Sequence, residues 1–263
     1  MKDRLDIIMT GRNMTASREK ARATIMAGLV YVDGERMDKP GAQVDVEAEI
    51  TIKEDLCPYV SRGGLKLEKA IELFGFSLDG CKAVDIGAST GGFTDCMLKN
   101  GAKKVYAVDV GYGQLDWKLR NDERVVNMEK TNIRYLDTEL IDDDIDFISI
   151  DVSFISLKLV FPVAAKLLSD KGALVCLVKP QFEAGRKQVG KKGIVRDAAV
   201  HEEVIENVVG YGLENGLYPH GLTYSPVKGT KGNIEYLMFM KKYPSDTDPD
   251  ISGTVRSSHD DLV

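Results

Sequence analysis

The pattern of apolar positions changes character near residue 59. Before it, apolar residues recur at helical spacing in RLDIIMTGR (4–12) and SREKARATIMAG (17–28). They then alternate around an Asp-Gly turn in LVYVDGERM (29–37) and again in QVDVEAEITI (43–52). Helical spacing predicts helices, and alternation predicts strands. We therefore expect two helices, a hairpin and one further strand, which together make a small α+β unit in residues 1–55.

Beyond residue 59, short apolar runs alternate with helical segments. A helix is predicted for SRGGLKLEKAIELFG, and strands for CKAVDIG, KKVYAVDVG, RVVNM, DIDFISID and GALVCLVKP. Strand–helix alternation predicts a mostly parallel sheet covered on both faces. After a long helix near 197–215, the runs LYPHGLTYSP and NIEYLMFMKKY predict an antiparallel edge. We expect an α/β domain in residues 65–243, preceded by a linker at 56–64.

The end of the chain and its overall charge add two expectations. Residues 244–263 have almost no apolar periodicity, so a disordered acidic tail is expected there. The net charge of −6 argues weakly against a nucleic-acid partner unless positive charge is concentrated locally. Between Lys2 and Arg22, six basic residues face three acidic ones. On charge alone, we interpret that excess as an ordinary solvated helix face.

The cysteines and the start of the chain exclude several classes of protein. The four cysteines show no C-x-x-C spacing and lie far in sequence from the three histidines, so neither a disulfide framework nor a metal site is predicted. The opening residues MKDRLD lack an apolar signal core, and no apolar run approaches the ~18 residues of a membrane span. We expect a cytoplasmic protein with no membrane partner. Monomer is our default, because no sequence feature marks an interface.

The stretch AVDIGASTGGFT (83–94) predicts a buried strand, a glycine-rich turn and a helix. Such a turn presents backbone N–H groups to a nucleotide-like ligand. Ser89 stands where a dinucleotide fingerprint has its middle glycine, and no Walker-type ending follows. Asp109 ends the next strand, where a carboxylate can accept hydrogen bonds from both ribose hydroxyls.

A nucleoside that carries an amino acid and no phosphate describes S-adenosylmethionine. A flavodoxin-like fold with an idle turn is the alternative, and it leaves Asp109 unexplained. The residues expected to contact the cofactor are Asp85, Gly87, Ala88, Ser89, Thr90, Gly91, Gly92, Phe93, Asp109 and Asn132.

Four charged residues stand in or next to apolar segments. Asp151 ends FISID, Lys179 ends VCLVK, Glu235 lies inside GNIEYLMF, and Lys66 lies on the helix before the first strand. Each alone could reach water, but together they suggest a site. Methylation of a ribose 2′-hydroxyl would suit them. Lys179 would act as a base of lowered pKa or would stabilise the developing alkoxide, and the sequence leaves both roles open.

The order Lys66, Asp151, Lys179 and Glu235 around DIGASTGGFTD resembles the Lys-Asp-Lys-Glu tetrad of FtsJ/RrmJ-like ribose 2′-O-methyltransferases. The chain to about Tyr243 resembles the TlyA group of ribosomal RNA (rRNA) methyltransferases, also filed under haemolysin A. In that group an S4-type RNA-binding domain precedes the methyltransferase. The motifs that carry the resemblance are RLD, SREKA, IMAGLVYVDG, DKPG, YVSRGGLKLEKA, DVSFISL, VKPQFE and KGNIEY. One departure is a short N-terminus, with almost nothing before Arg4.

The resemblance implies a Rossmann-like, S-adenosylmethionine-dependent enzyme that methylates a cytidine ribose of large-subunit rRNA, with small-subunit rRNA left open. It also implies that Arg4, Arg18, Lys20 and Arg22 contact RNA phosphates. We hypothesise that the connector 55–64 transmits RNA binding to the catalytic domain. Three alternatives stay open: a non-catalytic RNA-binding protein, a methyltransferase for another acceptor, and a membrane-active haemolysin. The last needs a signal peptide, a span or a strongly apolar amphipathic helix.

Overall fold

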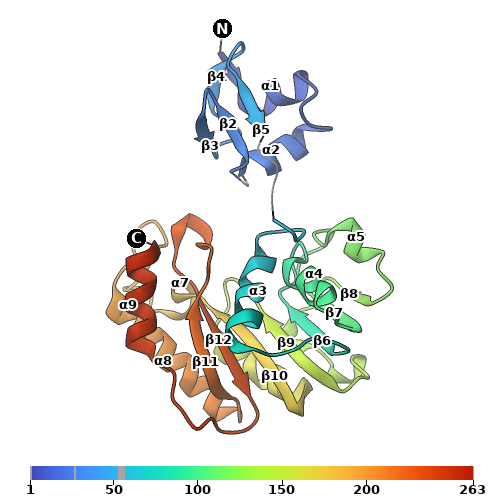
Figure 1. Ribbon diagram of the computed structural model, residues 1–263, viewed down its shortest axis with the longest axis vertical. Helices are drawn as coiled ribbons and strands as arrows, with labels where there is room; N and C mark the ends of the chain where they lie inside the picture. Colours follow the sequence, from blue (N-terminus) through green and yellow to red (C-terminus); the bar gives the residue numbers. More distant parts are fainter. Residues whose placement is uncertain (1, 27, 53–56, 263) are drawn as a thin grey trace. The chain divides into compact units, whose positions relative to one another are not determined.

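The computed structural model describes residues 2–26, 28–52 and 57–262 of the 263-residue chain. The chain divides into two compact units, Met1–Leu56 and Cys57–Val263 (Figure 1). The division falls near the expected linker. We call them the N-terminal unit and the large unit, and each is described by itself.

The N-terminal unit combines two helices with short strands. The helices are α1 (Leu5–Gly11) and α2 (Arg18–Met26); the strands are β1 (Lys2–Arg4), β2 (Val30–Val32), β3 (Glu35–Met37), β4 (Gln43–Asp45) and β5 (Ile50–Ile52). The predicted hairpin is confirmed: β2 pairs with β3, and Asp33 and Gly34 both have positive φ, as a tight hairpin turn requires. Its core contains Leu5, Met9 and Ile25, each fully buried.

The single strand expected over residues 43–52 is wrong, because it is two strands. β4 pairs with β1, whereas β5 pairs with β2. Between them, the Asp45 side chain accepts a hydrogen bond from Glu47 N, and Ala48 N donates to Asp45 O. The alternation of apolar and polar residues continues through this turn, because Ala48 is buried there. The sequence pattern therefore did not reveal the turn.

The large unit is built on a seven-stranded sheet of order β11-β12-β10-β9-β6-β7-β8. Its strands are β6 (Lys82–Ile86), β7 (Lys104–Val108), β8 (Val125–Met128), β9 (Ile145–Ile150), β10 (Leu168–Val178), β11 (Tyr218–Tyr224) and β12 (Tyr236–Lys241). Strands β6 to β10 pair in parallel with one another, and β12 is antiparallel to both β10 and β11. The predicted parallel sheet with an antiparallel edge is confirmed.

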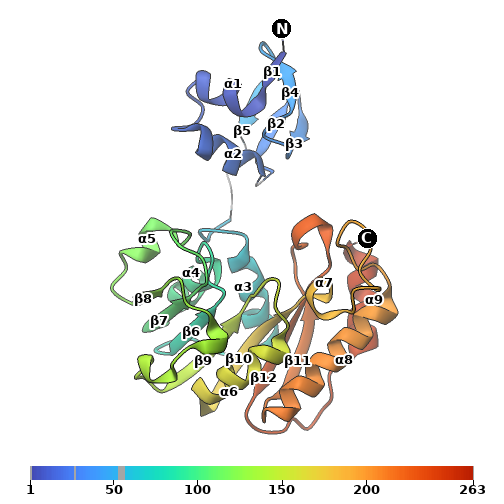
Figure 2. The same ribbon diagram turned by 180° about the vertical axis from the view of Figure 1, so that it is seen from behind.

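Helices cover both faces of this sheet. They are α3 (Gly63–Phe74), α4 (Gly92–Lys99), α5 (Trp117–Arg120), α6 (Phe161–Leu167), α7 (Pro180–Glu183), α8 (Ala198–Glu214) and α9 (Ile251–Leu262). α3 and α4 lie on one face, whereas α6 and α8 lie on the other (Figures 1 and 2). Neighbouring strand residues, such as Val175 and Cys176, join opposite cores. This double burial explains why the central strands are mostly apolar and do not alternate between apolar and polar residues.

The disordered tail predicted for 244–263 is wrong for its second half, which forms α9. This helix contacts α8 and β11. Val255 is 1% exposed, and Ser258 Oγ lies 3.0 Å from Tyr236 OH in the buried interface. The apolar residues of α9 are few and occupy a single face. The helix is therefore stabilised by a surface that the rest of the unit supplies, which a local pattern does not show.

Candidate active site

The four charged residues singled out in the sequence meet at one end of the sheet. Asp151 directly follows β9, and Lys179 directly follows β10. Glu235 directly precedes β12 rather than lying within it; because Tyr236 pairs with Val178 in an antiparallel ladder, Glu235 lies beside the end of β10. Lys66 reaches the same place from α3. The carboxyl ends of parallel strands are where α/β folds hold ligands.

These residues form a continuous charged chain, the tetrad. Lys179 Nζ lies 2.5 Å from Asp151 Oδ1. Lys66 Nζ lies 3.5 Å from Asp151 Oδ2 and 2.9 Å from Glu235 Oε2. Lys179 also donates to Ser153 Oγ at 3.2 Å. Cations and carboxylates therefore alternate in the order Lys179, Asp151, Lys66, Glu235.

The tetrad is largely buried, and the pKa values of Lys66 and Asp151 are shifted towards their charged forms. The side chains of Lys66, Lys179 and Glu235 are 11%, 9% and 3% exposed. Burial opposes the charged form of Lys66, but Asp151 and Glu235 outweigh it and raise its pKa. Burial likewise opposes ionisation of Asp151, but the two lysines hold its pKa below the ordinary value. Lys66 is thus a permanent cation that fixes two carboxylates, and it is not suited to act as a base.

Two residues of the short helix α7 support this site and were not found from sequence. Gln181 Nε2 donates to Glu235 Oε1 at 3.1 Å, and Gln181 Oε1 is buried with no partner among the described residues. Glu183 accepts hydrogen bonds from Ser156 Oγ and Leu157 N. The sequence did contain a signal for Gln181. Pro180 begins a helix at the end of β10, so the polar residue that follows it lies close to Lys179.

The glycine turn after β6 has the backbone that its sequence predicts. Gly87, Ser89 and Gly91 have φ values of 88°, 50° and 92°, and such values favour glycine. A side chain at Gly87 would overlap the carbonyl oxygen of Asp151. Asp109 accepts hydrogen bonds from Ser89 N at 2.8 Å and Gly111 N at 2.6 Å, so its carboxylate is fixed against the turn.

A cavity of about 700 Å³ opens beside this turn. Five of the predicted residues line it, namely Gly87, Ser89, Asp109, Asn132 and Asp151. It also touches residues that sequence reasoning did not name, among them Gln114, Thr131 and Ile155. The volume is in the range of small-molecule sites. Since Asp151 belongs to both, the cavity and the tetrad are one site.

The remaining predicted cofactor residues do not line the cavity; they are Asp85, Ala88, Thr90, Gly91, Gly92 and Phe93. Asp85 is fully buried and accepts hydrogen bonds from Thr94 N, Thr94 Oγ1 and Ser149 Oγ. Burial raises the pKa of Asp85 to about 6. Asp85 fastens the start of α4 to the sheet, and so it positions the turn. Contact of these six residues with a cofactor stays a prediction.

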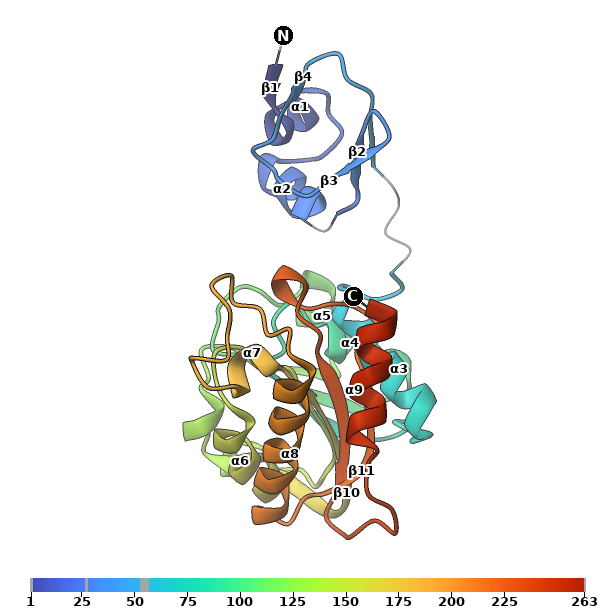
Figure 3. The same ribbon diagram turned by 90° about the vertical axis from the view of Figure 1, so that its left-hand side faces the viewer.

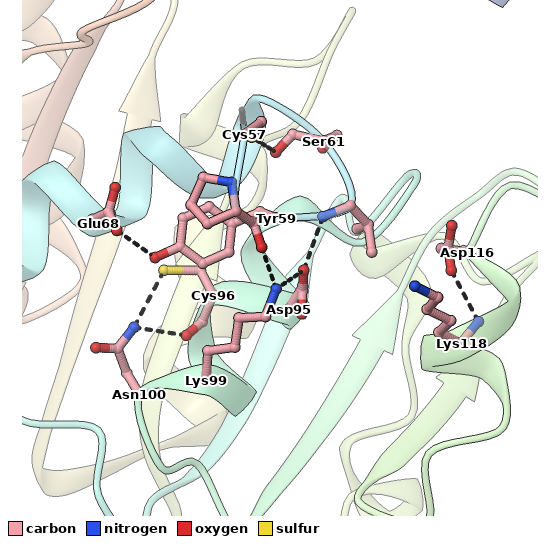
Figure 4. A network of polar contacts seen from close by, with 12 residues as sticks. Cys57, Tyr59, Ser61, Glu68, Asp95, Cys96, Lys99, Asn100, Asp116 and Lys118 are labelled. Carbon is pink, nitrogen blue, oxygen red and sulfur yellow. Dashed lines mark hydrogen bonds and ion pairs between the residues drawn. The ribbon is translucent and has the colours of Figure 1, made fainter. Parts of the chain in front are cut away.

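The expected linker, in its described part from Cys57 onwards, packs closely on α3 and α4 (Figure 4). Tyr59 OH donates to Glu68 Oε1 at 2.6 Å, and Val60 N donates to Asp95 Oδ2 at 2.8 Å. A side chain at Gly64 would overlap the Tyr59 ring. Since α4 begins within the glycine turn, this network joins the connector to the cavity wall. Residues 55–56 of the hypothesised connector lie outside the described residues, and its transmitting role stays a hypothesis.

Of the four predicted RNA contacts in the N-terminal unit, Arg4 and Arg18 share one carboxylate. Arg4 donates twice to Asp6 at 2.9 Å, and Arg18 Nε donates to Asp6 Oδ2 at 3.1 Å. Asp6 is fully buried, and its pKa is lowered to about 2, chiefly by the hydrogen bond from Arg4. Lys20 and Arg22 are exposed on α2. Their contact with RNA stays a prediction, and Asp6 was not anticipated.

The sheet order, the glycine turn with its acidic partner, and the cavity define the class of S-adenosylmethionine-dependent methyltransferase folds. The chain belongs to the FtsJ-like methyltransferase family, whose profile matches residues 59–242. The profile of the S4 domain matches residues 3–50.

Three relatives illustrate the similarity. A Bacillus subtilis protein described as a candidate rRNA methyltransferase, YqxC, is 52% identical over 240 residues, which cover 91% of this chain and 85% of that protein. The 16S/23S rRNA (cytidine-2′-O)-methyltransferase TlyA of Mycobacterium tuberculosis is 41% identical, over 90% of this chain and 89% of that protein.

A solved structure, described as a candidate hemolysin from Streptococcus thermophilus, shares 48% identity and a TM-score of 0.79. The match covers 98% of this chain and 96% of that one. Within the part of the chain that the structure describes, no helix is long and apolar enough to cross a membrane.

Proposed function

We propose that this protein transfers a methyl group from S-adenosylmethionine to the ribose 2′-hydroxyl of a cytidine in large-subunit rRNA; small-subunit rRNA is a second candidate substrate, because the relatives differ in this respect. The observation that carries the proposal is the tetrad, which shares Asp151 with the cavity beside the glycine turn. We further propose that the protein acts in the cytoplasm as a monomer.

The cavity suits the cofactor by size and by its polar groups. Asp109 is held by two backbone N–H groups, and each of its oxygens keeps lone pairs for the ribose hydroxyls. The backbone at Gly87 and Ser89, with Asn132 from the facing loop, would hold the methionine end and the base. When bound there, S-adenosylmethionine supplies an electrophilic methyl group on a sulfonium.

The tetrad would prepare the 2′-hydroxyl for attack. Lys66 is enclosed by two carboxylates, whereas Lys179 pairs with one carboxylate and one hydroxyl and keeps a third N–H. Lys179 is therefore the lysine suited to face the substrate oxygen. As a neutral amine it would accept the hydroxyl proton; as an ammonium it would donate a hydrogen bond to the developing alkoxide, and the hydroxyl proton would pass to water. Asp151 and Lys66 keep Lys179 in place, and Glu235 holds Lys66.

The decisive experiment measures labelled methyl transfer to isolated ribosomal subunits and to assembled ribosomes, and then maps the modified nucleotide. We expect label in rRNA with the wild type and loss of transfer with Lys179→Ala, whose cofactor affinity should be nearly unchanged. Lys166→Ala, at an exposed lysine on α6, is the matched control. No label on any ribosomal substrate, despite measured cofactor binding, would favour another acceptor or a scaffold role.

The cofactor site is tested separately by calorimetry with S-adenosylmethionine. Asp109→Ala should raise the dissociation constant about 10- to 100-fold, as expected for lost hydrogen bonds to a charged group. Asp142→Ala, an exposed aspartate outside the cavity, should not change it. An unchanged constant for Asp109→Ala would refute the ribose role.

A further inference from the structure

Two loop segments of the large unit carry only positive charge. The first spans residues 185–196 and ends just before Asp197, the N-cap of α8; the second spans residues 226–232, between β11 and β12, and we name the two segments the basic double loop. Together they contain seven basic residues and no acidic one: Arg186, Lys187, Lys191, Lys192, Arg196, Lys228 and Lys231. The net charge of these segments is positive, whereas the net charge of the whole chain is −6. Such a local excess creates a field that attracts polyanions.

The two loops form one body although about thirty residues separate them in sequence. Asn233, which is 3% exposed, joins them. Its Nδ2 donates to Gly193 O and Thr230 O, both at 3.0 Å, and its Oδ1 accepts from Val195 N at 3.1 Å. Both loops lie at the same end of the large unit (Figure 3). Their positive charges therefore form a single surface.

This surface adjoins the tetrad. Asn233 is two residues before Glu235, and a side chain at Gly229 would overlap the Glu235 carboxylate. The first loop follows α7, whose Gln181 donates to the same carboxylate. A substrate whose reactive oxygen reaches Lys179 would thus place its neighbouring groups near the basic double loop.

The seven cations have no counter-charge within the described residues. All seven are exposed, and none makes an ion pair or a hydrogen bond there. Three other cations of the unit are paired, by contrast: Lys82 and Lys104 share Asp143, and Arg120 binds Glu129. Seven like charges on one surface repel one another, and a bound anion would relieve that repulsion.

We propose that the basic double loop binds the phosphate backbone of the rRNA segment next to the target nucleotide. The proposal rests on the proposed function, and it gives the large unit a substrate-binding surface separate from the predicted contacts of the N-terminal unit. Contacts to phosphates position the RNA without reading its sequence. They also make binding depend steeply on salt, because each neutralised phosphate releases counterions.

The test uses the full-length protein and two triple variants. One removes three charges from the basic double loop: Lys191→Gln, Lys192→Gln and Lys231→Gln. The control removes three exposed lysines near the amino-terminal ends of the strands β7 and β10, away from the tetrad: Lys103→Gln, Lys166→Gln and Lys171→Gln. We would measure kcat and KM for ribosomal subunits, together with the salt dependence of binding to a short RNA hairpin.

We expect the loop variant to raise KM about tenfold or more while kcat stays within about twofold, and to reduce the salt slope by about 2 to 3. The control should match the wild type in all three. Unchanged thermal stability and cofactor affinity would show that the variant is folded.

Two results would overturn the proposal. One is an active wild type with an unchanged KM and salt slope in the loop variant. The other is a raised KM with an unchanged salt slope on RNA, which would assign the surface to a ribosomal protein. A wild type that methylates no ribosomal substrate would instead refute the proposed function itself.

Discussion

Both units hold an aspartate between two basic side chains, but the burial is reversed. In the N-terminal unit, Asp6 is fully buried, while Arg4 and Arg18 remain 40% and 53% exposed. In the large unit the cations are buried: the two lysines around Asp151 are 11% and 9% exposed, and Asp151 is 21% exposed and lines the cavity.

This difference separates a surface suited to binding from a site suited to reaction. A guanidinium group has five donors in a rigid fork, so Arg4 can bind Asp6 twice and still present N–H groups to solvent. An ammonium group is compact, and in a buried site its charge acts at short range on one atom. Under the proposed function, the same pairing of charges would serve RNA phosphates in one unit and a single hydroxyl in the other.

Of the substitutions that test this difference between the units, Lys66→Met should have the largest effect. It leaves Asp151 and Glu235 buried with one cation fewer, so we expect transfer to fall about 10²- to 10⁴-fold. Removing one member of a buried pair should also lower stability by about 3 kcal/mol. Single-turnover transfer and thermal unfolding would measure the two effects.

Lys69→Met is the control, since Lys69 lies on the same helix with its ammonium over the Tyr224 ring. A Lys66→Met enzyme with normal turnover would remove Lys66 from the site's machinery.

Gln181→Leu should have an intermediate effect on the same site. It removes the neutral donor to Glu235, and a lost hydrogen bond to a charged group predicts a decrease in kcat of about tenfold. Cofactor affinity should not change, because Gln181 does not line the cavity. Gln181→Glu, which would place a second carboxylate against Glu235, should lower kcat further. If both variants lower thermal stability but not kcat, Gln181 is only structural.

Asp6→Asn should have the smallest effect and concerns the N-terminal unit alone. The folded-state pKa of Asp6, about 2, lies below its unfolded value of about 4. Its contribution to stability is therefore present above about pH 4 and is lost as pH falls towards 2. We expect Asp6→Asn to be less stable at neutral pH and to lack this acid-sensitive component.

Methyl NMR of Ile8 and Ile25, both buried in the N-terminal unit, would follow its unfolding between neutral pH and pH 2. The exposed Asp38→Asn is the control. Equal acid sensitivity of Asp6→Asn and the wild type would show that Asp6 does not couple the two arginines to the fold.

Much of the fold was readable because its strands are buried on both faces. The runs around Val84, Val105 and Val175 are mostly apolar, and the helices between them predict parallel pairing. The predicted end of helix α3 was also correct, because Gly75 has a φ of 65° and ends the helix. The errors at Ala48 and at α9 have a common cause: both depend on partners distant in sequence.

The sequence by itself was enough to single out the four charged residues of the tetrad, because a charged residue next to an apolar strand is costly without a partner. Only the tertiary structure decided that Lys66 and Glu235, 169 residues apart, share a hydrogen bond. It also decided that Lys66 contacts two carboxylates and Lys179 only one, that Gln181 supports Glu235, and that two basic loops join through Asn233. Side-chain pairing depends on strand order and on burial, and neither is a property of any local stretch of residues.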